Sequence, residues 1–219
     1  MKINACSKSY GAKTVMRCEG LELKPAQVYA VIGANGSGKS TFARLVSGAL
    51  PADRNVKVLT GAAQVRYMPQ KSHAFRMSTL SNILLGGGGR ARAGALMRAL
   101  HLEELSGRRA KALSGGETAK MALARVLMQP SELLILDEPT AAMDMESAAA
   151  GEQLILDYRR RTGCTVLLIT HDLQQARRLA DQAIFFCAGN LLESGMADKV
   201  LFQPEKKETR QFLDFYGSV

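Results

Sequence analysis

The sequence predicts an α/β fold built on a mainly parallel sheet. Two short apolar runs without polar alternation, 133–136 and 165–169, are separated by a helical stretch from about 145 to 161. Continuous runs of this kind are typical of strands that are buried on both faces of a parallel sheet. A third run, 28–32, leads into a glycine-rich loop and then into a helical pattern. Together these observations indicate strands that alternate with helices along the chain.

The length and composition predict one globular domain. The chain has 219 residues, of which 47% are hydrophobic and 22% are charged, close to the average for globular proteins. These values argue against disorder, a fibrous repeat and a disulfide-rich mini-protein. The longest apolar runs fall far below the roughly 20 residues that cross a bilayer, and the first residues lack the apolar stretch of a secretory signal. We therefore expect a cytoplasmic protein.

The four cysteines agree with this location. Cys6, Cys18, Cys164 and Cys187 are widely spaced and form no CxxC pair or cluster with histidine. Scattered core or surface thiols are therefore favoured over a zinc site.

The first part of the chain is predicted to alternate strand and helix. The strand at 28–32 is followed by a glycine-rich loop and by a helix over 41–50, whose apolar residues recur at helical spacing. A second strand, 65–68, ends at Pro69-Gln70.

The middle of the chain is predicted to be helical with one interruption. A helical pattern begins at Leu80, stops at the four glycines 86–89 and resumes over 95–105. Because four consecutive glycines can scarcely remain in a stable helix, we expect them to loosen these helices. A further helix over 117–128 ends at Gln129-Pro130.

The positive charge is concentrated in one segment. Residues 54–125 contain thirteen Lys or Arg and three Glu, whereas the whole chain has a formal net charge of +9. The segment could face an acidic partner, anionic lipid or nucleic acid, and a merely solvated basic face is an equally good explanation. Aromatic residues make up only 5%, with no Trp, and none interleave with the basic residues. A groove for single-stranded nucleic acid is therefore disfavoured.

The loop 33–40 matches the phosphate-loop pattern G-x-x-x-x-G-K-[ST] between a strand and a helix. Glycines let the backbone fold around a phosphate, so that N–H groups and the positive end of the helix point at the anion. Lys39 can reach the β and γ phosphates, and the Ser40 hydroxyl can take a Mg²⁺ position. A chance glycine turn is the alternative, which the flanking strand and helix disfavour. The expected nucleotide-binding residues are Gly33, Asn35, Gly36, Ser37, Gly38, Lys39, Ser40 and Thr41.

Two carboxylates follow the apolar strand at 133–136. Open α/β sheets bind ligands at the carboxyl ends of their strands, where Asp137 and Glu138 lie. Asp137 would hold Mg²⁺, and Glu138 would orient the water that attacks the γ phosphate. Taken alone, a solvated or capping Asp-Glu pair is an equally good explanation. Next to a phosphate loop, the catalytic interpretation is favoured.

The motif Leu113-Ser114-Gly115-Gly116-Glu117 is similar to the LSGGQ signature of the nucleotide-binding subunits of ATP-binding cassette (ABC) transporters. The resemblance extends over almost the whole chain and implies a P-loop NTPase core with a small antiparallel β region and an inserted helical subdomain. It implies one ABC ATPase domain over 1–219, with the core at about 1–70 and 115–219 and the helical subdomain at about 71–114. Ser114, Gly115 and Gly116 of one subunit would then cover the ATP held by Lys39 of a second copy. The same Ser114 can also cap the following helix.

The resemblance assigns roles to four further residues. Tyr10 resembles the aromatic residue that stacks on adenine, although a lone Tyr more often serves packing. Gln70 resembles the glutamine that reaches Mg²⁺ and the attacking water and senses the membrane partner; an ordinary polar residue is the alternative. Asp144 matches the loop that touches the opposite subunit. His171 matches the histidine that contacts the γ phosphate, where a purely structural histidine is disfavoured.

The sequence departs from the family pattern in two ways. Glu117 replaces the usual Gln of the signature, which adds an anion near the polyphosphate and is expected to slow hydrolysis. The span 70–114 is also short for the family.

We therefore expect an ATPase that binds ATP and Mg²⁺, pairs head to tail with a second copy and powers a separate transmembrane permease. It would lie on the inner face of the membrane through that permease, with a solute-binding protein as a further partner. Solute import is favoured, and the stretch 68–85 is weakly similar to oxyanion importers of the tungstate or molybdate type. The alternatives are an export complex, a soluble ABC ATPase acting on nucleic acid or ribosomes, and a module that binds ATP without turnover.

Overall fold

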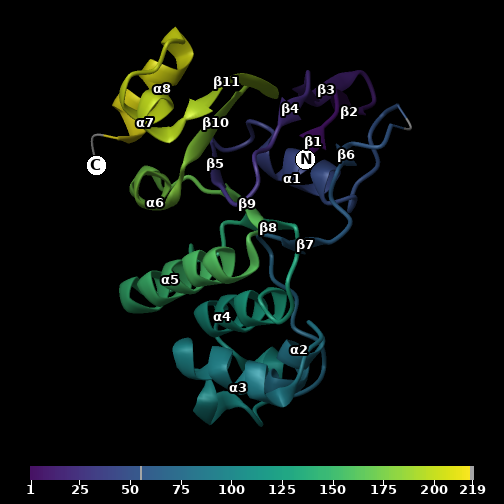
Figure 1. The fold of residues 1–219 in the computed structure, drawn as a ribbon, viewed down its shortest axis with the longest axis vertical. Helices are drawn as coiled ribbons and strands as arrows, with labels where there is room; N and C mark the ends of the chain where they lie inside the picture. The colour runs from purple at the N-terminus through teal and green to yellow at the C-terminus, as the bar shows by residue number, and fades with distance from the viewer. Residues whose placement is uncertain (55, 218–219) are drawn as a thin grey trace.

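The computed structural model describes residues 1–54 and 56–217. Its main sheet has eight strands, and the five in the order β10-β5-β9-β8-β7 are parallel (Figure 1). At the other side, β11 pairs antiparallel with β10 and parallel with β3, and β3 pairs antiparallel with β2. In sheet order the strands are β2 (Cys6–Tyr10), β3 (Lys13–Cys18), β11 (Asn190–Met196), β10 (Gln182–Cys187), β5 (Val28–Ile32), β9 (Thr165–Ile169), β8 (Leu133–Asp137) and β7 (Val65–Met68).

A second, antiparallel sheet of three strands lies near the N-terminus. Its order is β4 (Leu21–Glu22), β1 (Lys2–Ile3) and β6 (Leu59–Thr60). The expected combination of a mainly parallel sheet with a small antiparallel region is therefore confirmed.

The continuous apolar runs form the centre of the main sheet. Every residue of β5, β8 and β9 is buried, as expected for strands covered on both faces. Met68, Leu136, Leu168 and Ala30 are aligned across the four neighbouring strands β7, β8, β9 and β5. The loops that follow these strands therefore leave the sheet at one common edge.

The helices cover the faces of the sheet and form a separate layer below it (Figure 1). In chain order they are α1 (Lys39–Val46), α2 (Thr79–Leu84), α3 (Arg90–Ala99), the short 3-10 turns η1 (Glu103–Leu105) and η2 (Ala110–Ala112), α4 (Gly115–Val126), α5 (Met145–Thr162), α6 (Leu173–Leu179), α7 (Ala197–Phe202) and α8 (Lys207–Tyr216). Within the part of the chain that is described, no helix is sufficiently long and apolar to span a bilayer.

Two helices differ in extent from the expectation. The helix expected over 41–50 ends at Val46, because Gly48 takes a left-handed conformation with φ of 75°. The helix expected from residue 95 begins at Arg90. Its apolar residues Ala93, Leu96 and Met97 are buried, whereas Leu100 and Leu102 are buried just beyond its end.

The glycines between α2 and α3 make a close-packed turn rather than a loose one. A Cβ on Gly86 would overlap the carbonyl oxygen of Arg125 in α4, and a Cβ on Gly87 would overlap the Gln129 side chain. Arg66 of β7 fixes the same turn, because it donates hydrogen bonds to the Gly86 carbonyl (3.0 Å) and to Gln129 Oε1 (3.0 Å). The expected interruption of the helical pattern at these glycines is confirmed, and the missing side chains of Gly86 and Gly87 let two backbones approach. That the glycines loosen the helices stays a prediction.

The helices α2, α3 and α4 pack together into a helical lobe, defined here as residues 79–126, at the lower end of Figure 1. One hydrophobic cluster joins this lobe to α5 and to one face of the sheet, and a second joins α1 and the N-terminal strands to the other face. A third cluster, on β5 and β10, packs the C-terminal helices α6, α7 and α8. The division into a core and a subdomain at 71–114 stays a prediction.

Candidate nucleotide site

The phosphate loop joins β5 to α1 and depends on its glycines. Gly33, Gly36 and Gly38 have φ values of 146°, 78° and 103°, in the region that other residues rarely adopt. A Cβ on Gly33 would also overlap the carbonyl oxygen of Phe186 in β10. The loop is therefore held against the sheet at its start and bends outward at Ala34 to Gly36, which are exposed.

Lys39 and Asp137 are buried at the base of the loop. Lys39 Nζ donates to the carbonyl oxygens of Gly33 (2.7 Å) and Ala34 (2.9 Å). Burial lowers the pKa of Lys39, and the carboxylates of Glu138 and Asp137 oppose this effect. Burial likewise raises the pKa of Asp137, which is only 1% exposed, while a hydrogen bond from Ser40 opposes the rise.

Oxygen atoms suited to magnesium meet beside the loop. The Ser40 hydroxyl donates to Asp137 Oδ1 at 3.2 Å, so a hydroxyl and a carboxylate are already adjacent. The buried Ser37 hydroxyl has no hydrogen-bond partner within the described residues. Mg²⁺ prefers to share a few protein oxygens with substrate phosphates rather than occupy an all-protein cage. These residues therefore fit a magnesium ion that is bound together with a polyphosphate.

Glu138 and His171 form a direct pair. His171 Nδ1 lies 2.6 Å from Glu138 Oε2, with the carboxylate buried and the imidazole exposed. The backbone of Glu138 is held in the left-handed region, with φ of 55°, and its N–H donates to the Ile169 carbonyl at 2.9 Å. A left-handed glutamate is rare, and such conformations are concentrated at functional sites. The pair fixes where the carboxylate points.

Gln70 and Tyr10 lie at the margins of this arrangement. Gln70 is exposed two residues beyond β7 and, by the strand register, level with Glu138. Tyr10 is 57% exposed at the end of β2, where Lys8 Nζ lies 5.7 Å from the centre of its ring. Within residues 1–54 and 56–217, neither side chain forms a hydrogen bond or ion pair with the phosphate loop.

The signature motif begins α4 with a capping box. The Ser114 hydroxyl accepts from the Glu117 N–H (3.2 Å), and Glu117 Oε2 accepts from the Ser114 N–H (2.6 Å). The hydrogen bond from the Ser114 backbone holds the pKa of Glu117 below its ordinary value. Ser114 and Gly115 are exposed, whereas a Cβ on Gly116 would lie 2.8 Å from the Ala142 carbonyl oxygen. Glu117 therefore has a local role as a helix cap.

Asp144 caps α5. Its carboxylate accepts hydrogen bonds from the Ser147 N–H and from the Ser147 hydroxyl, both at 2.8 Å, and these bonds lower the pKa of Asp144. Because Gly116 packs on the preceding loop at Ala142, the signature and the Asp144 loop are joined within one chain.

A polar network that the sequence did not reveal lies next to the Glu138–His171 pair. Gln175 of α6 donates to Thr140 (2.8 Å) and to the buried Glu152 of α5 (3.0 Å), and Arg178 donates twice to the same Glu152 carboxylate. These residues line a cavity of about 490 Å³ that also contains Glu138 and His171. The four residues lie on three separate segments, namely the loop after β8, α5 and α6, so only their shared cavity identifies them.

Comparison with known proteins decides the family. The family model described as "ABC transporter" matches residues 19–141, more than half of the chain. The chain belongs to the ABC transporter family. ATP-binding proteins of this family are ATPases, and so is this chain.

Two curated ABC relatives cover most of the chain. The tungstate uptake system ATP-binding protein TupC of Peptoclostridium acidaminophilum is 36% identical over 88% of this chain and 96% of its own length. The zinc import ATP-binding protein ZnuC of Pseudomonas fluorescens is 33% identical over 84% of this chain and 72% of its own length. A bacterial ABC transporter cassette solved as a dimer is similar in fold, with a TM-score of 0.78 at 22% identity over 90% of this chain and 98% of its own.

In this ABC ATPase, the strand register assembles most of the predicted site. Lys39, Ser40, Asp137, Glu138 and His171 meet at the carboxyl edge of β5, β8 and β9. Thr41 is the third residue of α1, and Asn35 is exposed at the tip of the loop. The signature residues Ser114 to Glu117 and Asp144 lie instead at the starts of α4 and α5, away from α1 (Figure 1).

Proposed function

We propose that this chain is the ATP-hydrolysing subunit of a solute importer, in which two copies bind two MgATP molecules between them and drive a separate permease. The observation that carries the proposal is the buried Glu138 carboxylate, fixed by His171 at the sheet edge where Lys39 and Asp137 also lie.

The proposed roles follow from the geometry. The loop N–H groups, Lys39 and the unpartnered Ser37 hydroxyl would bind the phosphates. Ser40 and Asp137 would hold Mg²⁺, with Gln70 as a further ligand; bound magnesium neutralises the charge that develops on the phosphates. Glu138 would orient the attacking water, and His171 would hold the carboxylate in place and contact the γ phosphate.

A second copy is needed because the signature lies apart from the phosphate loop. The exposed Ser114 and Gly115 begin α4 in the helical lobe, and a helix N-terminus attracts anions. The bacterial cassette of the same fold is a dimer, which supports the pairing of two copies. In the proposed head-to-tail pair, this N-terminus covers the partner's nucleotide and Asp144 lies at the contact. Tyr10 would stack on adenine from the exposed end of β2.

Import is favoured by the relatives, which serve tungstate uptake and zinc import. The relative with 36% identity agrees with the weak oxyanion signal in the sequence, so tungstate or a similar oxyanion is the proposed solute. A solute-binding protein would deliver it, and the permease would hold the ATPase at the inner face of the membrane. No role for nucleic acid is proposed.

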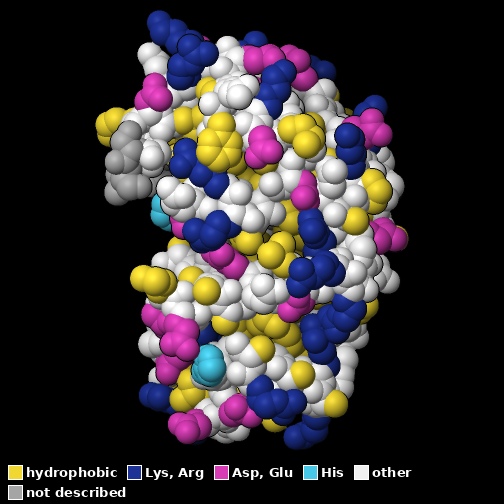
Figure 2. Space-filling model, turned by 60° about the vertical axis from the view of Figure 1, so that its left-hand side comes forward, with side chains coloured by type: hydrophobic (Ala, Val, Ile, Leu, Met, Phe, Trp, Pro, Cys, Tyr) yellow, Lys and Arg dark blue, Asp and Glu magenta, His cyan; other side chains and the backbone are white. Residues whose placement is uncertain are grey.

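A basic surface formed by the helical lobe and the segment just before it is the proposed contact with the permease. Arg76, Arg109 and Lys111 surround a hollow of about 480 Å³, and among residues 1–54 and 56–217 none of the three has an acidic partner. In Figure 2, Lys and Arg side chains follow one side of the visible face from mid-height downward, and the lower part of this face is the level of the helical lobe in Figure 1. An acidic cytoplasmic segment of the permease would complement this charge.

The variant Glu138→Gln tests the proposed function. Loss of the base should lower steady-state hydrolysis by about a hundredfold or more while ATP binding persists, so ATP should accumulate a dimer that light scattering detects. Glu104→Gln, an exposed position in η1, is the matched control and should behave as the wild type. Unchanged hydrolysis in Glu138→Gln would remove Glu138 from its role, and a monomer with ATP bound would contradict the shared site.

A further inference from the structure

Two of the four cysteines face each other across the β2–β3 hairpin. In the antiparallel register Cys6 is directly opposite Cys18. Directly opposite residues in such a pair have Cα atoms about 4.5 to 5.5 Å apart, which lies within the Cα spacing of about 4.4 to 6.8 Å that a disulfide requires. Cys164 and Cys187 have no such neighbour among the described residues.

The environment favours the reactive form of one thiol. The hydrogen bond from Cys6, assisted by the N–H of Gly20, lowers the pKa of Cys18 to about 7, while the same bond raises the pKa of Cys6. The lowered pKa increases the thiolate fraction of Cys18 near neutral pH, and the thiolate is the nucleophilic form. Burial instead raises the pKa of Cys164.

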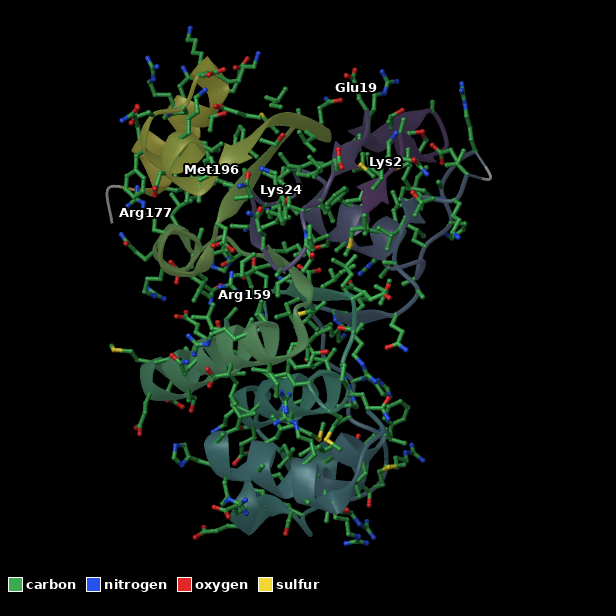
Figure 3. The ribbon with its side chains drawn as sticks, viewed as in Figure 1. Lys2, Glu19, Lys24, Arg159, Arg177 and Met196 are labelled. Carbon is green, nitrogen blue, oxygen red and sulfur yellow. The ribbon has the colours of Figure 1, made fainter. Side chains whose placement is uncertain are left out.

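A small reagent can approach the pair from outside. Both cysteines line a pocket of about 290 Å³ that also contains Arg17 and Arg54. Glu19, which follows Cys18, lies at the upper edge of the molecule and points outward in Figure 3. Each cysteine is less than a tenth exposed, so a reagent must reach the two sulfur atoms through this pocket.

The hairpin lies directly behind the phosphate loop. The Arg17 N–H donates to the Gly189 carbonyl at 2.7 Å, and the Gly189 N–H donates to the Ser37 carbonyl at 3.1 Å. A Cβ on Gly38 would lie only 3.1 Å from the Val15 carbonyl oxygen of β3. Because little space separates β3 from the loop, a covalent link between β2 and β3 at Cys18 would restrict the loop that binds the phosphates.

We propose that Cys6 and Cys18 are a peroxide-sensitive dithiol whose intramolecular disulfide locks the β2–β3 hairpin behind the phosphate loop and weakens nucleotide binding. The Cys18 thiolate attacks one peroxide oxygen, the O–O bond breaks, and the released hydroxide takes a proton to become water. The Cys6 sulfur then attacks the resulting sulfenic acid; an S–S bond forms, the S–O bond breaks, and hydroxide leaves with the Cys6 proton as water. Two thiols are oxidised to one disulfide while one peroxide is reduced to two waters.

Treatment of the folded protein with hydrogen peroxide tests the disulfide without reference to ATP. Peptide mapping should find Cys6 linked to Cys18 in the monomer, and the rate of linkage should rise about tenfold between pH 6 and pH 8 as Cys18 ionises. In the Cys6→Ser variant, oxidation should stop at a sulfenic acid on Cys18, which dimedone traps. The Cys18→Ala variant should form neither the disulfide nor the trapped sulfenic acid. Cys187→Ser is the control and should form the same link. Equal oxidation of all four cysteines, or a link only after unfolding, would overturn the proposal.

The effect on nucleotide binding rests on the proposed function and is measured separately. Oxidised protein should bind ATP at least about threefold more weakly than reduced protein, dithiothreitol should reverse the change, and Cys6→Ser should not show it. Equal affinities of the oxidised and reduced forms would overturn the coupling. Absence of ATP binding in both forms would instead contradict the proposed nucleotide site.

Discussion

The base of the phosphate loop contains two ionisable side chains whose charged forms are opposed by burial. Burial lowers the pKa of Lys39 and raises that of Asp137, although the two charges attract each other. Their charged forms therefore cost stability in the folded chain. This arrangement fits a site that is completed by ligands, because phosphates and magnesium would supply the missing counter-charges.

The variant Asp137→Asn should therefore be more stable while losing magnesium-dependent hydrolysis. A carboxyl group whose pKa is higher in the folded state than in the unfolded state binds more protons when the chain is folded. The free energy of unfolding therefore falls as the pH rises from the unfolded pKa to the folded pKa, and the full loss of stability is present above the folded pKa. Removing the charge should raise the free energy of unfolding at pH 8 by on the order of 1 kcal/mol. Chemical denaturation at pH 8 and at pH 5 measures the change, which should shrink at the lower pH.

A matched substitution isolates this effect. Asp157→Asn removes an exposed carboxylate of α5 whose pKa is lowered by Arg160, so it should leave stability unchanged or slightly reduced. If Asp137→Asn were the less stable of the two, the ion pairing with Lys39 would outweigh the burial of Asp137, and the interpretation of this site would fail.

Individual residues of the site could be predicted to different degrees. The phosphate loop and the acidic pair were predictable because each occupies consecutive positions with a fixed chemical pattern. The contact between Glu138 and His171 was not, because it depends on the register of β8 and β9, which neither segment encodes alone. Glu117 was expected to act through its charge, but its carboxylate is bound to its own helix N-terminus.

At the level of secondary structure, the turn between α2 and α3 is the feature that most depends on missing side chains. The variant Gly86→Ala should lower the free energy of unfolding by about 1 to 3 kcal/mol, because its Cβ would overlap the Arg125 carbonyl of α4. The matched control Gly94→Ala, in the open interior of α3, should instead stabilise by up to about 1 kcal/mol. Urea denaturation distinguishes the two, and equal effects would contradict the close packing of the turn.

The strands were more predictable than the helix ends. The strands 28–32 and 65–68 were predicted with their observed bounds, because an apolar run stops where polar residues begin. Helix ends depend on packing. Helix α3 begins at Arg90, five residues before its predicted start, with Gly89 as the N-cap after the glycine turn. The sequence did not predict the β10–β11 hairpin or the helices α6, α7 and α8. Their apolar residues are related to one another only through the hydrophobic cluster that they form with β5.

At the scale of the whole molecule, the basic surface of the helical lobe should decide whether the ATPase finds its permease. Reversing charge in the double variant Arg109→Glu and Lys111→Glu should lower recovery of the permease in a pull-down by about tenfold or more, with ATP affinity unchanged. The control Lys206→Glu with Lys207→Glu has the same change in net charge at the opposite end, at the start of α8, and should retain the permease. Equal recovery of both double variants would refute this docking surface.

Parallel pairing gives the catalytic centre one further property. Gly33, Gln70, Glu138 and His171 follow four different strands, and the last of these to be synthesised, β9, lies between β5 and β8. A nascent chain that ends before residue 165, or one with β9 detached, therefore has no assembled hydrolytic centre. If these residues carry hydrolysis as proposed, turnover reports that β9 has been made and has paired between β5 and β8.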